Sequence, residues 1–246
     1  MDCRKTKKEL TYAHEIEKHL KRLAKERPLS YIANNFCKYV RRQELTRFLF
    51  RYDIFTKILE IKGSIIECGV FSGNGLMAWS QLSTILEPID FSRRIYGFDT
   101  FEGFPSIHQK DSRTDKANSK AGDIKDDCYE ELTNCIELFN LNRLLSQFTK
   151  VTLIKGNFLE TGETFLKENP HVLIALLYLD FDLYEPTKKA LELFLPRMSR
   201  GSIIGFDEIN NPDWPGETIA LLESFDLKDI QIRKYNYEPN MSYIII

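Results

Sequence analysis

The chain is poor in the residues that build zinc sites and disulfide frameworks. Its 246 residues include four histidines and five cysteines. The cysteine count is odd, no CxxC pair occurs, and no cysteine lies near a histidine at zinc-ligand spacing. Reduced thiols in a cytoplasmic protein are the simplest interpretation.

Long apolar runs and an excess of one charge are also missing. The longest apolar run, residues 172–179, is far too short to span a bilayer, and residues 1–27 contain no apolar stretch resembling a secretory signal. The formal net charge is −2, whereas a nucleic-acid binder usually carries a strong positive excess. We therefore expect neither a membrane span nor a nucleic-acid partner.

The sequence has no internal repeat or low-complexity stretch, and its N-terminal part looks helical. Apolar residues recur at three- and four-residue spacing from Leu10 to Leu23, and a second such pattern covers residues 41–61. We predict an N-terminal helical segment over residues 1–60, serving in packing, as a lid or as a homodimer contact. The basic excess before Pro28 is interpreted as the solvated face of a packing helix.

Residues 61–246 alternate between short apolar runs and helical patterns, which predicts a second, α/β domain. Helices are expected over residues 76–86, 130–145 and 186–198. This alternation predicts a mostly parallel seven-stranded sheet with helices on both faces. The expected strands are residues 64–68, 94–98, 151–155, 172–179, 202–206, 230–234 and 242–246.

The expected strands end in acidic residues. Ligands of such sheets bind beyond the carboxyl ends of the strands. Four acidic ends facing one crevice concentrate negative charge, which calls for cations or sugar hydroxyls as partners. These ends carry Glu67, Asp99, Asp180 and the pair Asp207 and Glu208.

The turn after the first strand predicts a nucleoside site. Gly69, Gly73 and Gly75 allow a tight turn and close approach to a ligand, but their spacing is not the G-x-G-x-x-G of dinucleotide enzymes. Glu67 would repel a pyrophosphate and would suit a ligand with an ammonium and a sulfonium group. A tight strand-to-helix turn without a ligand is the alternative.

Two further positions fit the nucleoside. Asp99 ends the second strand, where open α/β sheets place an acid that binds the ribose hydroxyls. A helix cap or a turn residue is its alternative. After the third strand, Asn157 offers an amide to the edge of adenine and Phe158 a ring to its face. Asn157 also forms a common turn pair with Gly156.

The fourth and fifth strand ends predict the reacting end of the crevice. Carboxylate oxygens are the ligands of a hard divalent ion, and no His or Cys lies nearby to favour zinc. We predict Asp180, Asp207 and Glu208 as ligands of Mg²⁺. Asp182 shares a face with Asp180 and is a further ligand or the general base. Helix capping and turn formation are the alternative for each of these residues.

These segments resemble the macrocin O-methyltransferase family, which includes sugar O-methyltransferases of tylosin, mycinamicin and novobiocin biosynthesis. The similarity spans about residues 60–225. In this family a second Asp usually stands where this chain has Glu208, and residues 106–127 resemble the family's lid only loosely. The matching segments are residues 66–70 (IECGV) with Gly73, 97–105 (GFDTFEGFP), 179–187 (LDFDLYEPT), 206–208 (FDE) and 215–218 (PGET).

The resemblance implies a Rossmann-like class I methyltransferase fold, S-adenosylmethionine as the methyl donor, Mg²⁺ dependence and a sugar or glycosylated acceptor. Asp180 and Asp182 are the expected catalytic residues, with His108 as an alternative base in a lid over residues 104–127. The residues expected to bind the donor are Glu67, Gly69, Val70, Phe71, Gly73, Asp99, Thr100, Asn157, Phe158 and Asp180.

Two other classes of protein remain open from the sequence. The first is a nucleotide- or nicotinamide-dependent enzyme with a Rossmann-like fold, which the glycine spacing and Glu67 disfavour. The second is a non-catalytic binding protein that keeps the methyltransferase fold, which the acidic set disfavours. The sequence does not identify the acceptor or the hydroxyl that would be methylated.

Overall fold

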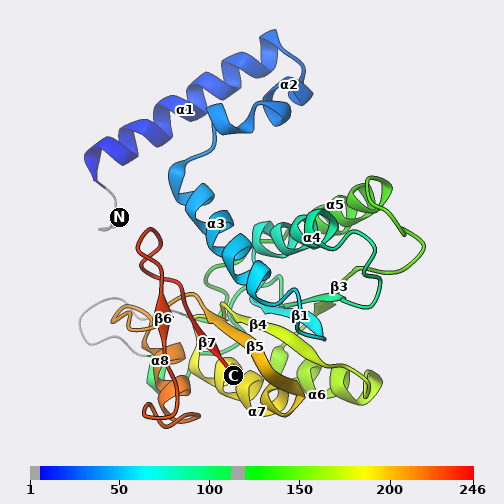
Figure 1. Cartoon of the computed structure of the whole chain (residues 1–246). Coiled ribbons are helices and arrows are strands. Elements are labelled where there is room, and N and C mark those ends of the chain that lie inside the picture. The colour runs from blue at the N-terminus through cyan, green and yellow to red at the C-terminus, as the bar shows by residue number, and fades with distance from the viewer. Residues whose placement is uncertain (1–5, 112–119) are drawn as a thin grey trace. The chain divides into compact units, whose positions relative to one another are not determined.

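The computed structural model describes residues 6–111 and 120–246 (Figure 1). The chain divides into two compact units, Met1–Arg47 and Phe48–Ile246. The division falls inside helix α3 (Arg42–Lys57), earlier than the expected domain boundary at residue 60. The physical reason is that the second half of α3 buries Phe50, Ile54 and Phe55 in the core of the second unit.

The first unit contains α1 (Lys7–Glu26), α2 (Leu29–Asn34) and a 3-10 turn (Phe36–Lys38). A capping box begins α1: the Glu9 N–H donates to the Thr6 hydroxyl oxygen (3.2 Å) and the Thr6 N–H donates to the Glu9 carboxylate (2.9 Å). None of the α1 residues is buried, so its apolar stripe remains accessible. Within the described ranges, no helix has the length and apolar character needed to cross a membrane.

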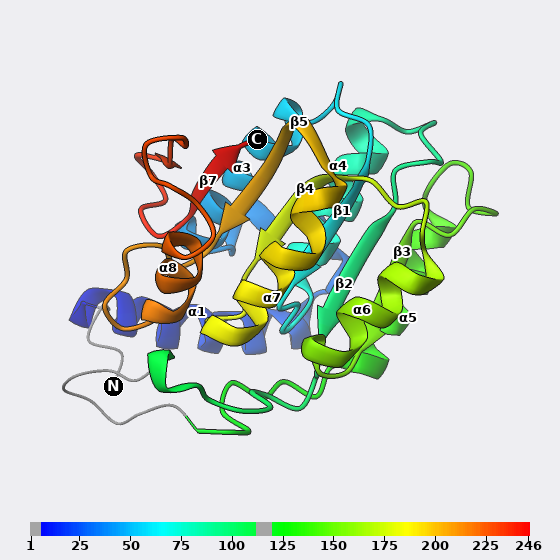
Figure 2. The same ribbon diagram turned by 90° about the horizontal axis from the view of Figure 1, so that it is seen from below.

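The second unit is built on a seven-stranded sheet with the order β3-β2-β1-β4-β5-β7-β6 (Figure 2). Strands β1 to β5 are parallel, whereas β7 pairs antiparallel with β5 and β6 with β7. The sheet is thus mostly parallel, as expected, but its edge formed by β7 and β6 is antiparallel. The strands are β1 (Ser64–Cys68), β2 (Ile95–Asp99), β3 (Val151–Lys155), β4 (Ile174–Leu179), β5 (Met198–Phe206), β6 (Arg233–Lys234) and β7 (Ser242–Ile245).

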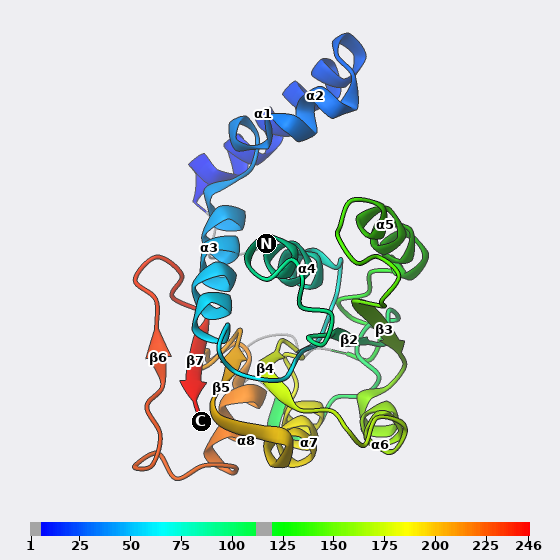
Figure 3. The ribbon, with the colours of Figure 1, turned by 45° about the vertical axis from the view of Figure 1, so that its right-hand side comes forward.

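Helices cover both faces of the sheet (Figure 3). One core cluster joins the sheet to α3, α4 and α5, and the other joins it to α6, α7 and α8. Helices α5 and α7 end before the expected residues 145 and 198, and β6 is shorter than the expected 230–234. The helices of this unit are α4 (Asn74–Leu86), α5 (Tyr129–Leu141), α6 (Phe158–Glu168), α7 (Tyr184–Phe194) and α8 (Pro215–Leu222), with 3-10 turns at Gln109–Asp111 and Leu195–Arg197.

The strand order reverses between β1 and β4, because β2 and β3 follow β1 on one side and β5 follows β4 on the other. Such a reversal opens a crevice at the carboxyl ends of the strands, and ligands of open α/β sheets bind there. The acidic residues named above stand at this end of β1, β2, β4 and β5.

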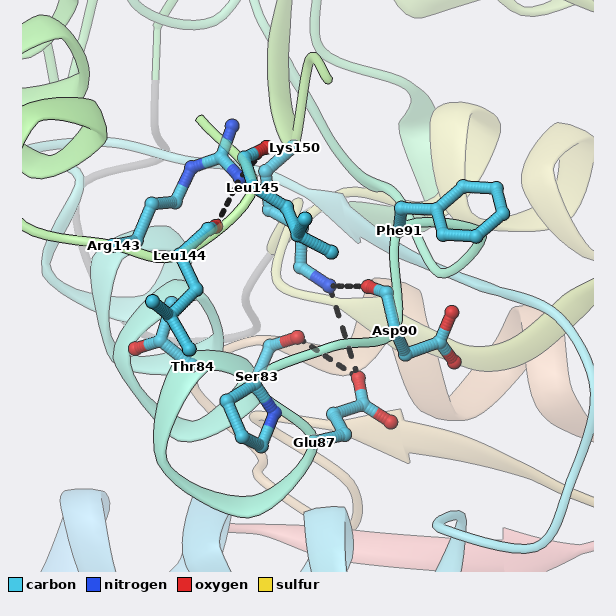
Figure 4. A pocket seen from close by; sticks show the side chains of 10 residues that line it. Ser83, Thr84, Glu87, Asp90, Phe91, Arg143, Leu144, Leu145 and Lys150 are labelled. Atoms are coloured by element: carbon cyan, nitrogen blue, oxygen red, sulfur yellow. Dashed lines mark hydrogen bonds and ion pairs between the residues drawn. The ribbon is translucent and has the colours of Figure 1, made fainter. Parts of the chain in front are cut away.

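The opposite end of the sheet is held by a buried ionic cluster. Lys150 Nζ donates to the Asp90 carbonyl (2.9 Å) and lies 3.9 Å from Glu87, beside a cavity of about 10 Å³ that has room for one water molecule (Figure 4). Arg93 Nε donates to Glu87 (2.9 Å), and the rest of its guanidinium binds main-chain oxygens at 2.9–3.1 Å. These oxygens belong to Ile58, Ile61 and Gly63.

We expect Arg93→Lys to lower the free energy of unfolding by about 3 kcal/mol, because an ammonium cannot reach the carboxylate and three carbonyls that the planar guanidinium serves. Urea denaturation of both proteins measures this difference. Arg94→Lys is the matched control, since Arg94 is half-buried and donates to a single carbonyl, that of Thr149. Equal stability of the Arg93 variant and the wild type would contradict this account of the cluster.

Candidate active site

The carboxyl ends of β1 and β4 approach each other very closely. The Asp180 N–H donates to the Cys68 carbonyl (2.8 Å), and the Gly69 N–H donates to the Phe98 carbonyl (2.9 Å). A Cβ atom at Gly69, whose φ is +90°, would lie 1.9 Å from the Asp180 carbonyl oxygen. Only glycine fits at this position. The glycine turn after β1 is therefore held directly against the acidic turn after β4.

Asp99, at the end of β2, organises the glycine turn. Its Oδ2 accepts hydrogen bonds from the Val70 and Phe71 N–H groups (2.8 Å each), and its Oδ1 accepts one from the Phe101 N–H (2.7 Å). A carboxylate oxygen has two lone pairs, so Oδ1 can still accept a further hydroxyl. The neighbouring Thr100 hydroxyl donates to the Gly103 carbonyl (2.6 Å).

Glu67 forms a buried ion pair that sequence reasoning missed. Its Oε1 lies 3.8 Å from an Arg51 nitrogen, and both side chains are at least 95% buried. The Arg51 guanidinium also lies over the rings of Trp79 and Tyr178, at 5.6 and 5.2 Å. A Cβ at Gly75 would lie 2.0 Å from Glu67 Oε1, so this glycine is required by the pair.

Burial dominates the protonation of Glu67. It raises the pKa of Glu67 to about 8, although the neighbouring Arg51 opposes the shift. The sequence gave one indication of the partner of Glu67: Arg51 lies between apolar positions on the buried side of α3. This pattern indicates a buried cation but does not identify the acid that it pairs with.

The Asn157 and Phe158 side chains have structural roles. Asn157 is the N-cap of α6, and its side chain accepts a hydrogen bond from the Leu159 N–H (3.1 Å). The Phe158 ring is enclosed by Phe98, Phe181 and Phe194 and is 3% exposed. This packing does not support the expected stacking of Phe158 on adenine, because the first residue of α6 points into the core.

Carboxylates gather at the ends of β4 and β5. Asp180 is half-buried, and burial together with the charges of Asp207 and Asp182 raises its pKa well above the ordinary value. Asp207 Oδ1 accepts a hydrogen bond from the Tyr178 hydroxyl (2.9 Å). Asp182 adopts the left-handed conformation with φ +61°. The structure thus brings three of the expected reacting residues into one charged neighbourhood.

Glu217 joins this group from the first turn of α8. It is fully buried, and burial together with the charges of Asp182 and Asp207 raises its pKa well above the ordinary value. Its Oε2 accepts a hydrogen bond from the Glu208 N–H (3.2 Å). Sequence reasoning missed Glu217 because an acid in the first turn of a helix usually just complements the helix dipole.

The metal ligands expected from the sequence do not form a metal site in this arrangement. The Glu208 carboxylate accepts a hydrogen bond from the Asn211 side chain. Over the described ranges 6–111 and 120–246, no three His, Cys, Asp or Glu side chains converge closely enough to hold a metal ion as they stand.

His108 lies in the segment that leads from β2 to α5. Its ring packs against Tyr184 with a centroid distance of 5.0 Å, and its Nδ1 accepts a hydrogen bond from the Lys110 N–H (3.1 Å). Asp111 fixes the same segment by accepting the Tyr184 N–H (2.7 Å) at the start of α7. Part of the expected lid, residues 112–119, lies outside the described residues.

The fold and the acidic strand ends define an α/β protein of the methyltransferase class, and solved structures agree. The chain is similar to the crystal structure of CalS11, a calicheamicin methyltransferase, with 32% identity, a TM-score of 0.89 and coverage of 98% of this chain and 93% of CalS11. The O-methyltransferase NovP has the same fold, with 21% identity, a TM-score of 0.58 and coverage of 81% and 78%.

Sequence comparison places the chain in a family. Residues 3–220 match the macrocin O-methyltransferase (TylF) family, and the chain belongs to it. A curated relative from Streptomyces olivaceus, 8-demethyl-8-(2,3-dimethoxy-alpha-L-rhamnosyl)-tetracenomycin-C 4'-O-methyltransferase, is 28% identical over 155 residues. That match covers 60% of this chain and 53% of the relative, about half its length.

The raised pKa of Glu67 predicts a pH-dependent difference between the wild type and Glu67→Gln. The folded value of about 8 exceeds the ordinary 4.5, so the carboxyl contributes stability below pH 4.5 that is lost as the pH rises through 8. We expect the wild type to lose more than about 1 kcal/mol relative to Glu67→Gln between pH 5 and 8.5. Urea denaturation at both pH values measures this. A constant difference would mean that Arg51 keeps Glu67 ionised throughout.

Proposed function

We propose that the protein transfers a methyl group from S-adenosylmethionine to a hydroxyl of a sugar or glycosylated substrate. The observation that carries this proposal is the contact of the glycine turn after β1 with the acidic turn after β4. One edge of the sheet can then hold a donor beside carboxylates that activate an acceptor. Membership of the macrocin O-methyltransferase family supports the same function.

The donor would lie along the ends of β1 and β2. Asp99 would accept a ribose hydroxyl through Oδ1, which has spare acceptor capacity. Residues 69–73 would supply backbone close to the methionine part, with the carboxyl groups of Glu67 and Asp180 near its ammonium and sulfonium groups. Thr100 and Asn157 remain proposed neighbours of the nucleoside. S-adenosylmethionine supplies an electrophilic methyl carbon when bound.

We also propose a Mg²⁺ ion at the reacting end. The support is the chemistry of the donor set: the charges of acids at the ends of β4 and β5 help to raise the pKa values of Asp180 and of Glu217 of α8, and one oxygen of the buried Glu217 has no hydrogen-bond partner among the described residues. Asp180, Asp207 and Glu208 are the proposed ligands, drawn together from their present positions. A bound Mg²⁺ supplies a Lewis acid that lowers the pKa of an acceptor hydroxyl.

In the proposed reaction the acceptor oxygen attacks the methyl carbon, a C–O bond forms and the C–S bond breaks. The products are a methyl ether and S-adenosylhomocysteine. Asp182 would receive the hydroxyl proton, because it stands next to the proposed acceptor position and its backbone is held in a defined left-handed turn. His108 remains the alternative proton acceptor.

For the acceptor we propose a hydroxyl of a rhamnose-type deoxysugar, which is either part of a glycoside or linked to a nucleotide. Two relatives support this acceptor. The Streptomyces olivaceus protein is named as a methyltransferase of a rhamnosyl tetracenomycin. A second CalS11 structure is described as a TDP-rhamnose 3'-O-methyltransferase; it is 30% identical, has a TM-score of 0.82 and covers 98% of this chain and 95% of that one.

The N-terminal helices remain a proposed homodimer contact, because α1 buries none of its own residues and keeps an apolar stripe. A cytoplasmic location remains a prediction from the cysteines. Four of them, Cys37, Cys68, Cys128 and Cys135, are free thiols in the described part of the chain.

Calorimetric titration with S-adenosylhomocysteine, in Mg²⁺ and again in chelator, tests the donor site. We expect binding in both conditions, because most of the proposed donor contacts come from the ends of β1 and β2, and Asp180 is the one proposed metal ligand among them. NAD and ATP serve as controls for a nucleotide-dependent enzyme. Absence of S-adenosylhomocysteine binding in both conditions, with binding of either control ligand, would replace the methyltransferase proposal.

Asp180→Asn tests the reacting end. We expect loss of metal-dependent methylation by at least about 100-fold, because a carboxylate that holds the cation beside the acceptor is gone, while S-adenosylhomocysteine affinity changes little. Methyl transfer to a panel of TDP-deoxysugars and rhamnosides measures the first, and calorimetry the second. Full activity of this variant would remove Asp180 from the metal site.

A further inference from the structure

Phe104 and Trp214 form an aromatic pair that joins the loops after two distant strands. Phe104 follows β2 and Trp214 follows β5, yet their rings meet edge to face with a centroid distance of 5.9 Å. Strands β1 and β4 stand between β2 and β5 in the sheet. Neighbouring strands lie about 4.8 Å apart, so the two loops close a span of roughly 14 Å.

The segment that carries Phe104 runs across the carboxyl ends of the strands. Figure 2 shows it passing along this end of the sheet from β2 to the 3-10 turn beside α8. In that turn Asp111 accepts the Tyr184 N–H at the start of α7 (2.7 Å), and a Cβ at Gly216 would lie 2.3 Å from Asp111 Oδ1. The aromatic pair therefore lies across the ends of β1 and β4, where the glycine turn meets the acidic turn.

Main-chain hydrogen bonds fix the position of both aromatic residues. The Phe104 N–H donates to the Asp123 carbonyl (3.1 Å), and the Phe104 carbonyl accepts the Gly122 N–H (2.8 Å). The Trp214 N–H donates to the Asn211 carbonyl (3.2 Å), and Trp214 is the N-cap of α8. The two rings are thus presented from a defined backbone.

The two rings are not core residues. Both are partly exposed, and neither belongs to the two core clusters formed by the described residues. A partly exposed indole beside a ligand-binding crevice offers a flat apolar surface with a polar edge. A pyranose ring has a matching apolar face made of C–H groups, and a deoxysugar of the rhamnose type adds a methyl group in place of a hydroxymethyl group.

We propose that Trp214, in contact with Phe104, binds the acceptor by stacking on its sugar ring and so favours a deoxysugar. This inference rests on the proposed function, since it names a binding residue for the acceptor of that reaction. Stacking holds the sugar equally before and during methyl transfer. Loss of the indole therefore raises the KM for the acceptor and leaves kcat nearly unchanged.

Fluorescence of the wild type tests the contact directly. The chain has two tryptophans, and Trp79 is fully buried, so quenching by acrylamide reports mainly on Trp214. With S-adenosylhomocysteine present, we expect TDP-rhamnose to lower the quenching constant at least about twofold, because a stacked ring covers the indole. TDP alone should leave it unchanged. Equal protection by TDP, or no protection by TDP-rhamnose, would overturn the proposal.

Substitutions separate binding from catalysis. We expect Trp214→Ala to raise the KM for TDP-rhamnose at least about tenfold, and Trp214→Phe, which keeps a ring, less than about threefold. Thermal unfolding and S-adenosylhomocysteine affinity should match the wild type. Phe91→Ala is the matched control, because Phe91 is exposed and pairs with Phe148 at 5.0 Å in the loop before β2, at the other end of the sheet.

The remaining outcomes are distinct. A folded Trp214→Ala protein with the wild-type KM would overturn the proposal, as would a fall in kcat at an unchanged KM. Protection of Trp214 by TDP-rhamnose in a protein that binds no S-adenosylhomocysteine and transfers no methyl group would instead remove the proposed methyltransferase function and keep the sugar contact.

Discussion

The close contact between the ends of β1 and β4 is the constraint on which the site depends. A side chain at Gly69 would overlap the Asp180 carbonyl oxygen, so the two turns can meet only because this residue lacks a Cβ. The contact lies where the strand order reverses. It places the turn organised by Asp99 beside the carboxylates of the next two strands. In the proposed function, donor and acceptor would thereby share one crevice.

Buried charge is arranged differently at the two ends of the sheet. At the amino ends, Arg93 and Lys150 are matched by Glu87 and by main-chain carbonyls, so each cation of that cluster has partners. At the carboxyl ends, Arg51 is the one cation among the described buried residues that faces the acidic group. The first end stabilises the fold, whereas the second gathers acids whose pKa values are raised by burial and by neighbouring acids, which is typical of a functional site.

The alternation of apolar runs and helical patterns was enough to predict the α/β fold, a mostly parallel sheet of seven strands and the acidic strand ends. Local pattern could not predict the antiparallel edge, because β6 has only two residues and its pairing is tertiary. Arg51 was missed because its partner Glu67 lies in a different segment, and Glu217 because an acid in the first turn of a helix usually complements the helix dipole. The packing of Phe158 in the core could not be predicted locally, because an aromatic residue after a turn looks the same whether it faces a ligand or the core.

The edge strand β6 has a consequence for how the protein associates. Its two residues, Arg233 and Lys234, are both exposed cations. A short strand carrying like charges resists pairing with the same strand of another molecule, because the two edges repel each other and offer few hydrogen bonds. At high protein concentration, the β6 edges of two molecules therefore do not pair to form the continuous sheet of a fibre.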